Sequence, residues 1–184
     1  MSRNRVTLLV VVLFYAVNAL GQSKKFTVQK SEMSFTSNAE LELIKAQSTE
    51  TQGLLDPATN QFAFSVSVQS FRGFNSDLQR QHFNENYMES SKFSKASFTG
   101  KIIEQVNYTR DSVYTVRAKG ELDIHGQKQT RIIKARLTVR KNDIQIDADF
   151  NVPLADHNIS IPKIVSQKIA TEIDVKFRGT LVQQ

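Results

Sequence analysis

Alternation of apolar and polar residues runs through most of this chain, and a period of two fits only β-strands. In residues 61–70, Phe62, Phe64, Val66 and Val68 share one face, while small or polar residues share the other. Between repeats of this pattern lie Gly, Pro, Asn and Asp, which favour turns. The predicted strands are 25–37, bent near Lys30, and then 51–56, 61–70, 96–102, 112–124, 133–140, 144–152 and 173–181.

About eight strands joined mostly by short turns form an antiparallel sheet that either closes into a barrel or stacks into a sandwich. Residues 39–46 suit a helical turn as well, but a strand or irregular edge is favoured because Leu41 and Leu43 alternate. Every strand has one apolar face, so both architectures enclose a single interior. The sequence predicts an all-β domain, and a barrel is slightly favoured because eight strands leave room for one ligand.

Two segments depart from the alternation and show helical spacing instead. Within 74–101, Leu78, His82 and Phe83 recur at helical spacing, which predicts a short helical insertion between strands. Pro162 suits the first position of a second short helix before the last strand, with Ile164, Val165, Lys168 and Ile169 on it. The insertion carries an unusual number of large apolar side chains: Phe74, Phe83, Tyr87, Met88 and Phe93.

The N-terminus has the organisation of a secretory signal peptide. Arg3 and Arg5 precede an apolar run over 6–17, and Ala19 and Gly21 supply the small residues of a cleavage site. The run is shorter than the roughly 20 residues that a membrane-spanning helix needs. We therefore expect cleavage after Gly21, one domain over 22–184, and a secreted or periplasmic protein.

Composition excludes several classes of function. The 184 residues are 40% hydrophobic, which is ordinary for a folded domain, and the net charge of +6 is scattered along the chain. A nucleic-acid site would require a basic stripe with interleaved aromatic residues, and we predict none. The chain has no Cys, so it uses neither disulfides nor a lipid-modified N-terminal cysteine.

The three histidines do not predict a catalytic or metal site. His82, His125 and His157 lie far apart in the sequence, and none has a partner at metal-ligand spacing beyond Glu85 near His82. Asp156 and His157 are adjacent, but no nucleophile motif accompanies them. We therefore expect no enzyme, no catalytic residues, no metal and no required cofactor.

Three motifs together resemble the YceI-like family of bacterial secreted proteins. The segment 80–84 followed by 93–98 is similar to the helical insertion of that family and its next strand, with Ser94 where Pro is usual. The hairpin 120–126 is similar to a family hairpin, with Asp123 in place of Thr. The segment 156–165 is similar to one common in the branch from Bacteroidetes-type bacteria.

The resemblance implies a lipocalin-like antiparallel barrel with an elongated apolar interior. It further implies a carrier that encloses a long-chain lipid such as a polyisoprenoid, an isoprenoid quinone or a fatty amide. The expected partners are this hydrophobic ligand, a transient membrane contact and a second copy in a homodimer. The alternative is a stress-associated or interaction domain of β-strands with a filled core and no ligand.

Inward-facing residues of the strands and of the insertion are the candidate lipid-binding residues. The wall candidates are Phe64, Val66, Phe98, Leu122, Leu137, Ile146, Phe150, Val175 and Phe177. The candidates for a lid over the interior are Phe74, Phe83, Tyr87, Met88 and Phe93.

Overall fold

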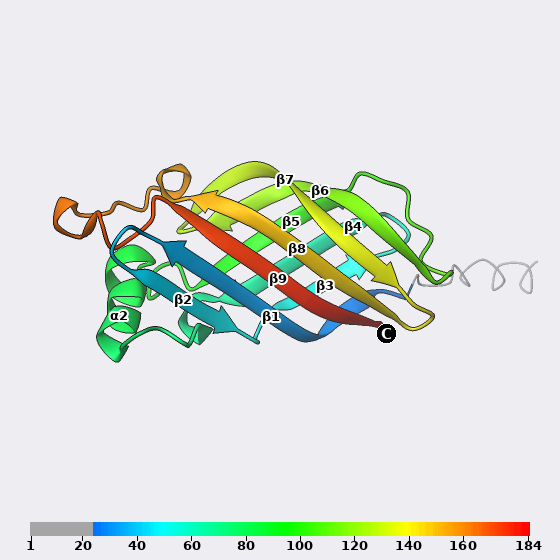
Figure 1. Ribbon diagram of the computed structural model, residues 1–184. Coiled ribbons are helices and arrows are strands. Elements are labelled where there is room, and N and C mark those ends of the chain that lie inside the picture. Colours follow the sequence, from blue (N-terminus) through cyan, green and yellow to red (C-terminus); the bar gives the residue numbers. More distant parts are fainter. Residues whose placement is uncertain (1–23) are drawn as a thin grey trace, which may run out of the picture.

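The computed structural model describes residues 24–184, so the predicted signal peptide over 1–21 lies outside the described residues. These residues form one sheet of nine strands, shown as arrows in Figure 1. In the same residues, no helix is long and apolar enough to cross a membrane. The strands are β1 (Phe26–Asn38), β2 (Leu43–Ser48), β3 (Gln52–Asp56), β4 (Gln61–Ser67), β5 (Lys95–Ile102), β6 (Ser112–Ile124), β7 (Gln127–Val139), β8 (Asp143–Pro153) and β9 (Glu172–Gln183).

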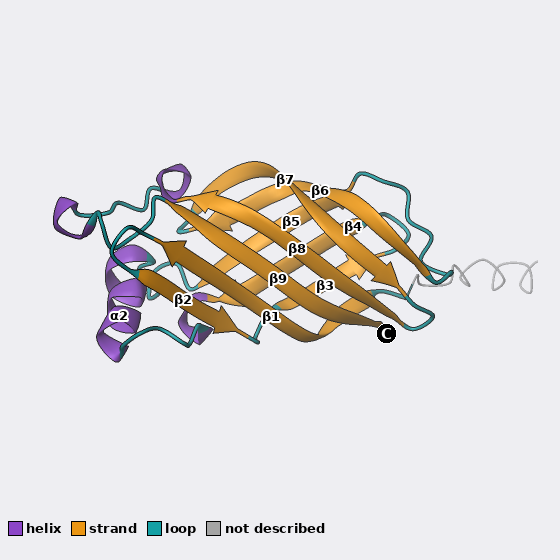
Figure 2. Ribbon diagram, viewed as in Figure 1, coloured by secondary structure: helices purple, strands orange, loops and turns teal. Residues whose placement is uncertain are grey.

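Pairing between β1 and β9 closes eight of these strands into a barrel. Neighbours from β3 to β9 pair in chain order, all antiparallel, and β1 pairs with β9 from Phe26 opposite Gln183 to Thr36 opposite Asp174. The other edge of β1 pairs with β3 at Phe26 and Thr27. The ring is therefore complete, and the predicted all-β, lipocalin-like barrel is confirmed over the sandwich (Figure 2).

The ninth strand, β2, extends the wall at one end of the barrel. It pairs with the second half of β1, from Met33 to Asn38, on the edge that β3 also uses. Its far edge bridges to Arg72 through two backbone hydrogen bonds of 2.8 Å between Gln47 and Arg72. At this end the chain that follows β4 therefore completes the wall beside β2.

Strand β4 is shorter than the alternation predicts. It ends at Ser67, and Val68–Ser70 forms a 3₁₀ turn, η1. The Ser70 hydroxyl donates to the Ser67 carbonyl at 2.6 Å and lies 2.5 Å from the Ser48 hydroxyl. These bonds turn the chain away from the sheet although Val68 continues the apolar pattern.

The helical insertion is confirmed, whereas the predicted helix before the last strand is reduced to a turn. Helix α2 (Asp77–His82) continues into a π-helical turn, η2 (Phe83–Tyr87). Between β8 and β9 lie two 3₁₀ turns, η3 (Leu154–His157) and η4 (Lys163–Val165). Pro162 caps η4 instead of occupying its first position.

The β8–β9 loop forms short turns in place of the predicted helix because it is hydrogen-bonded to the β1–β2 hairpin. Gln167 O accepts from Leu41 N at 2.9 Å, and Ala170 N donates to Ser37 Oγ at 2.9 Å. Helical spacing of apolar residues predicted a helix here, but Ile164 is 92% exposed and packs against nothing.

A packed cluster fills the barrel end opposite α2. Tyr108, from the β5–β6 loop, lies 6.1 Å from the ring of Phe26. Its hydroxyl donates to Asn60 Oδ1 at 2.9 Å, and burial raises the pKa of this phenol. Around this pair lie several of the most deeply buried residues of the barrel, among them Leu55, Leu137, Val139, Ile144 and Leu181.

Replacing Tyr108 by Phe should lower the free energy of unfolding by about 1–3 kcal/mol, because Asn60 Oδ1 would remain buried without its donor. Urea unfolding measures the change. Tyr114→Phe is the matched control, since its exposed hydroxyl bonds only at 3.3 Å to Asn107 N, and its effect should stay within about 0.5 kcal/mol. Equal effects of the two changes would contradict this account of the closed end.

Candidate functional site: an apolar cavity inside the barrel

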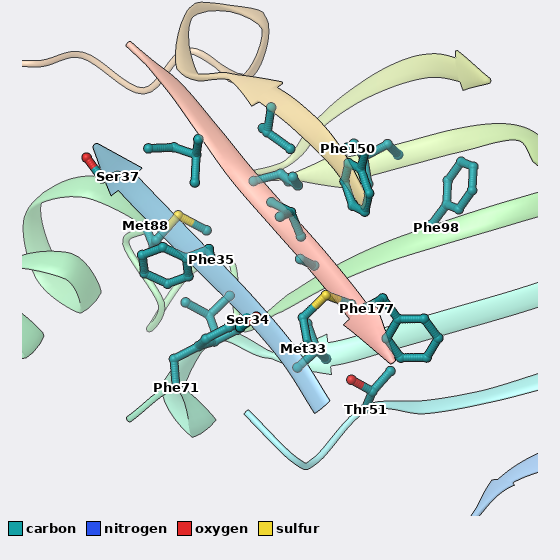
Figure 3. Close-up of a pocket in the computed structure, with 18 of the residues that line it drawn as sticks. Met33, Ser34, Phe35, Ser37, Thr51, Phe71, Met88, Phe98, Phe150 and Phe177 are labelled. Atoms are coloured by element: carbon teal, nitrogen blue, oxygen red, sulfur yellow. The ribbon is translucent and has the colours of Figure 1, made fainter. Parts of the chain in front are cut away.

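A cavity of about 560 Å³ lies inside the barrel, between the packed cluster and the end covered by α2. Figure 3 shows Met33, Phe35, Phe98, Phe150 and Phe177 around it, contributed by strands that are distant in sequence. Ligand pockets in proteins are typically about 300–1,000 Å³, so the volume suits one small or chain-like molecule. In a closed eight-stranded sheet, every second residue of a strand points inward, and these inward residues form the lining.

Most of the predicted wall residues line the cavity. Leu137 does not: it is 1% exposed and belongs to the packed cluster at the closed end. Alternation tells which face a side chain occupies but not how far along the barrel axis it lies, and this explains the difference. The wall residues that line the cavity are Phe64, Val66, Phe98, Leu122, Ile146, Phe150, Val175 and Phe177.

Four of the five lid candidates also line the cavity. The Phe83 ring stacks on Phe35 with centroids 5.3 Å apart, and Phe74 and Phe71 lie 5.1 and 6.1 Å from it. We call Phe35, Phe71, Phe74 and Phe83 the aromatic cluster. The lid residues that line the cavity are Phe74, Phe83, Tyr87 and Met88.

Sequence reasoning missed two members of this cluster as site residues. Phe35 alternates with Met33 in the first strand, so the pattern could have identified it. Phe71 lies beyond the end of β4, where no periodic signal points inward. Its burial, at 7% exposure, follows from the turn made by Ser70.

Local hydrogen bonds explain the shape of the lid, which we define as residues 74–93. The Ser76 side chain caps α2 by accepting from Gln79 N at 3.1 Å. Met88 N donates to Phe83 O at 2.9 Å, an i to i+5 bond of a π-turn, and Asn84 Nδ2 donates to Arg80 O at 2.9 Å. The wider turn lets Phe83, Tyr87 and Met88 all line the cavity, and burial raises the pKa of the Tyr87 phenol.

Phe93 is the lid candidate that does not line the cavity. Its ring packs edge-on against the His125 ring at 4.6 Å and lies over Gly126, whose φ is +69°. A Cβ on Gly126 would approach the ring to 2.5 Å, so Gly is required there for close approach as well as for the turn. Phe93 therefore holds the end of the lid to the β6–β7 turn.

A polar contact reinforces this attachment. His125 Nε2 lies 3.0 Å from Glu89 Oε2, and His125 Nδ1 lies 3.1 Å from the His157 carbonyl oxygen. A carboxylate and a carbonyl are both hydrogen-bond acceptors, so each nitrogen of the His125 ring faces an acceptor. We call Glu89, His125 and the His157 carbonyl the clasp; it joins the lid, the β6–β7 turn and the β8–β9 loop.

Polar side chains at the cavity gather where it meets solvent. Exposed His82 and Lys168 line it there, together with Glu42 and with Leu78, which is 60% exposed. Glu42 Oε1 accepts from Gln79 Nε2 at 2.9 Å and so ties the β1–β2 hairpin to α2. The cavity is thus open at this end, which we call the mouth, and closed at the other.

The histidines occupy three separate environments. His82 lies at the mouth and His125 in the clasp, while His157 is 0% exposed and contacts the Gln127 carbonyl through Nδ1 at 3.1 Å.

Asp156 accepts a hydrogen bond from Arg131 at 3.3 Å and does not pair with its neighbour His157. Residues 24–184 hold no group of three or more metal-ligating side chains.

The fold and the cavity define a closed antiparallel barrel around an apolar interior. A family model described as the YceI-like domain matches residues 15–181, nearly the whole chain. The protein therefore belongs to the YceI-like domain family. No curated protein matches the sequence significantly.

Solved structures share the barrel at low sequence identity. A polyisoprenoid binding domain from Saccharophagus degradans, implicated in plant cell wall breakdown, is 14% identical with a TM-score of 0.71, covering 86% of this chain and 98% of that one. BcnA from Burkholderia cenocepacia is 16% identical with a TM-score of 0.67, covering 82% and 95%. A YCEI protein from Campylobacter jejuni is 13% identical with a TM-score of 0.57, covering 76% and 84%.

Changing Glu89 to Gln should loosen the lid locally without unfolding the barrel, because the change removes the negative charge that faces His125. The Glu89 side chain is 47% exposed, so the loss in global stability should stay below about 1 kcal/mol. Hydrogen exchange of the amides in the lid should accelerate while exchange in β6–β9 is unchanged.

Glu85→Gln is the matched control for this experiment. Glu85 accepts from Gln81 of its own helix at 3.1 Å, and this contact does not join the lid to the barrel. Equal acceleration in both variants would show that the clasp does not hold the lid.

Proposed function

We propose that the protein is a secreted or periplasmic carrier that encloses the tail of one long-chain amphiphile. The lipid class is a polyisoprenoid, an isoprenoid quinone or a fatty amide, and no catalysis is involved. The observation that carries the proposal is the apolar cavity of about 560 Å³, whose lining includes exposed polar side chains at the mouth. Such a shape suits a molecule with a long apolar tail and a polar head.

Transfer of the tail from water provides the binding free energy. Each buried CH₂ contributes about 0.8 kcal/mol, so a tail of roughly a dozen carbons gains on the order of 10 kcal/mol before ordering costs. This gain requires no hydrogen bond to the tail, and the lining is mostly apolar, with a few Ser and Thr side chains such as Thr51. An apolar tunnel discriminates weakly between tails of similar width, so the head group and the length select the ligand.

The relatives support the lipid class. One structure with the same fold is named a polyisoprenoid binding domain, and this name describes that protein. For this chain, the alternative of a filled core without ligand requires the interior to be packed, and the cavity argues against it. The signal peptide predicted over 1–21 supports export, and a homodimer stays a prediction.

Purified protein should release a lipid in a one-to-one ratio with the chain. Native mass spectrometry before and after solvent extraction measures the ratio and the mass of the ligand. Protein that is empty after purification and takes up no lipid when offered isoprenoid and fatty chains would exclude the carrier function.

A change in the wall should alter the length of the retained tail. Ala118 faces the cavity, so Ala118→Phe should shorten the tail that is bound. The matched control is Ala63→Phe, because Ala63 lies between the inward residues Phe62 and Phe64 and is not part of the lining. Its ligand should have the same mass as that of the unchanged protein.

Replacing Tyr87 by Asp should weaken lipid retention more than folding. The change places a charge on the cavity lining, and an apolar tail cannot pair with it, so affinity should fall by at least about tenfold. Competitive displacement by a fluorescent fatty probe measures the affinity, and urea unfolding measures the stability.

Asn86→Asp is the matched control, since it adds the same charge one residue away on the exposed side of the turn. Retention should then equal that of the unchanged protein. A parallel loss of stability and retention in Tyr87→Asp would mean that the lid is part of the folding core.

A further inference from the structure

Large apolar side chains are exposed together around the mouth of the cavity. Ile164 is 92% exposed, Leu41 64%, Leu78 60% and Leu43 47%. They come from the β8–β9 loop, the β1–β2 hairpin and α2, which lie at the same end of the barrel in Figure 1. We call these four residues the apolar rim.

Hydrogen bonds hold the three segments in a fixed arrangement. Leu41 N donates to Gln167 O at 2.9 Å, which joins the hairpin to the loop. Asn75 Nδ2 donates to Leu43 O at 3.1 Å, which joins the hairpin to the segment before α2. These bonds join the three segments that carry the apolar rim at one end of the barrel.

The apolar rim is continuous with the cavity lining. Leu78 belongs to both, and Val165 and Lys168 line the mouth beside Ile164. Exposed apolar residues that cluster at one site mark contact surfaces. Here the surface surrounds the opening through which an apolar tail would have to pass, so a partner seated on it would shield that tail from water.

The charges near Ile164 have one sign. Residues 158–171 contain Lys163 and Lys168 and no acidic residue. Lysine stems can lie along apolar surface while the ammonium groups reach phosphates. Glu40, Glu42 and Asp77 also lie at this end, so the attraction to an anionic surface is confined to the β8–β9 loop.

We propose that the apolar rim docks on the surface of a lipid bilayer, with Ile164 and Leu41 inserted among the acyl chains and Lys163 and Lys168 at the phosphates. The mouth then faces the membrane, and a tail passes between bilayer and cavity without crossing water. This inference rests on the proposed carrier function and adds where and how the lipid is exchanged.

Vesicle co-sedimentation tests the docking with residues 22–184, which contain the complete barrel and exclude the apolar N-terminal run. The chain should sediment with phosphatidylcholine vesicles, and more strongly when phosphatidylglycerol is added, because anionic lipids attract the two lysines. Ile164→Asp should weaken sedimentation by at least about tenfold, since it places a charge in the apolar layer.

The matched control is Ile132→Asp, which adds the same charge on the outer wall of β7, where Ile132 is 56% exposed. Its sedimentation should equal that of the unchanged chain. Equal effects of the two variants would overturn the role of the apolar rim, as would soluble behaviour of the unchanged chain with both vesicle types. Binding of the apolar rim to a partner protein in place of vesicles would also overturn the proposed docking on a bilayer.

Failure of docking and failure of the carrier function give different results. Neither Ile164 nor Leu41 lines the cavity, so Ile164→Asp should keep the lipid that was bound before purification. A chain that carries lipid but ignores vesicles would overturn docking alone. A chain that binds vesicles but never holds lipid would overturn the carrier function, and with it the exchange that we assign to the apolar rim.

Discussion

The antiparallel pairing of β1 with β9 is the constraint on which the rest of the structure depends. It joins the first strand of the described chain to the last, and so turns a sheet with two open edges into a ring. In a ring of eight strands the inward side chains meet across an enclosed interior. Core, cavity and mouth all follow from that closure, because no inward residue is buried by its own hairpin alone.

One interior serves two purposes at its two ends. At the closed end, Tyr108 and Phe26 fill the space and the residues around them are almost inaccessible. Toward the mouth, the facing residues leave a void, and residues of the lid form part of its lining. The lid is held at its start by the bridge between Gln47 and Arg72 and at its end by the clasp. Stability and accessibility are therefore separated along the barrel axis.

Most of the fold could be predicted from sequence because alternation is a local property. Phe62, Phe64 and Val66 show their inward face without reference to any other strand, and the same holds for most wall residues. How far along the barrel axis a side chain lies depends on strand register and on closure of the ring, which alternation does not reveal. Alternation therefore predicts that Leu137 lines the cavity, whereas it lies in the packed cluster.

Contacts between loops that are distant in the chain also could not be predicted from the sequence. Phe93 was predicted to face the interior, but its place is set by His125 and Gly126, some thirty residues later. Phe71 and the clasp likewise depend on turns that hydrogen bonds create. The helix predicted after Pro162 failed for the same reason, since bonds to the β1–β2 hairpin replace helical bonds.

The closed end of the cavity has a consequence for the order of events. If the protein carries an amphiphile as we propose, the tail would enter from the mouth first and leave last, and the head would stay at the mouth. A tail longer than the cavity would then leave its surplus length outside the mouth, so the depth of the cavity would limit the length of tail that the proposed carrier encloses.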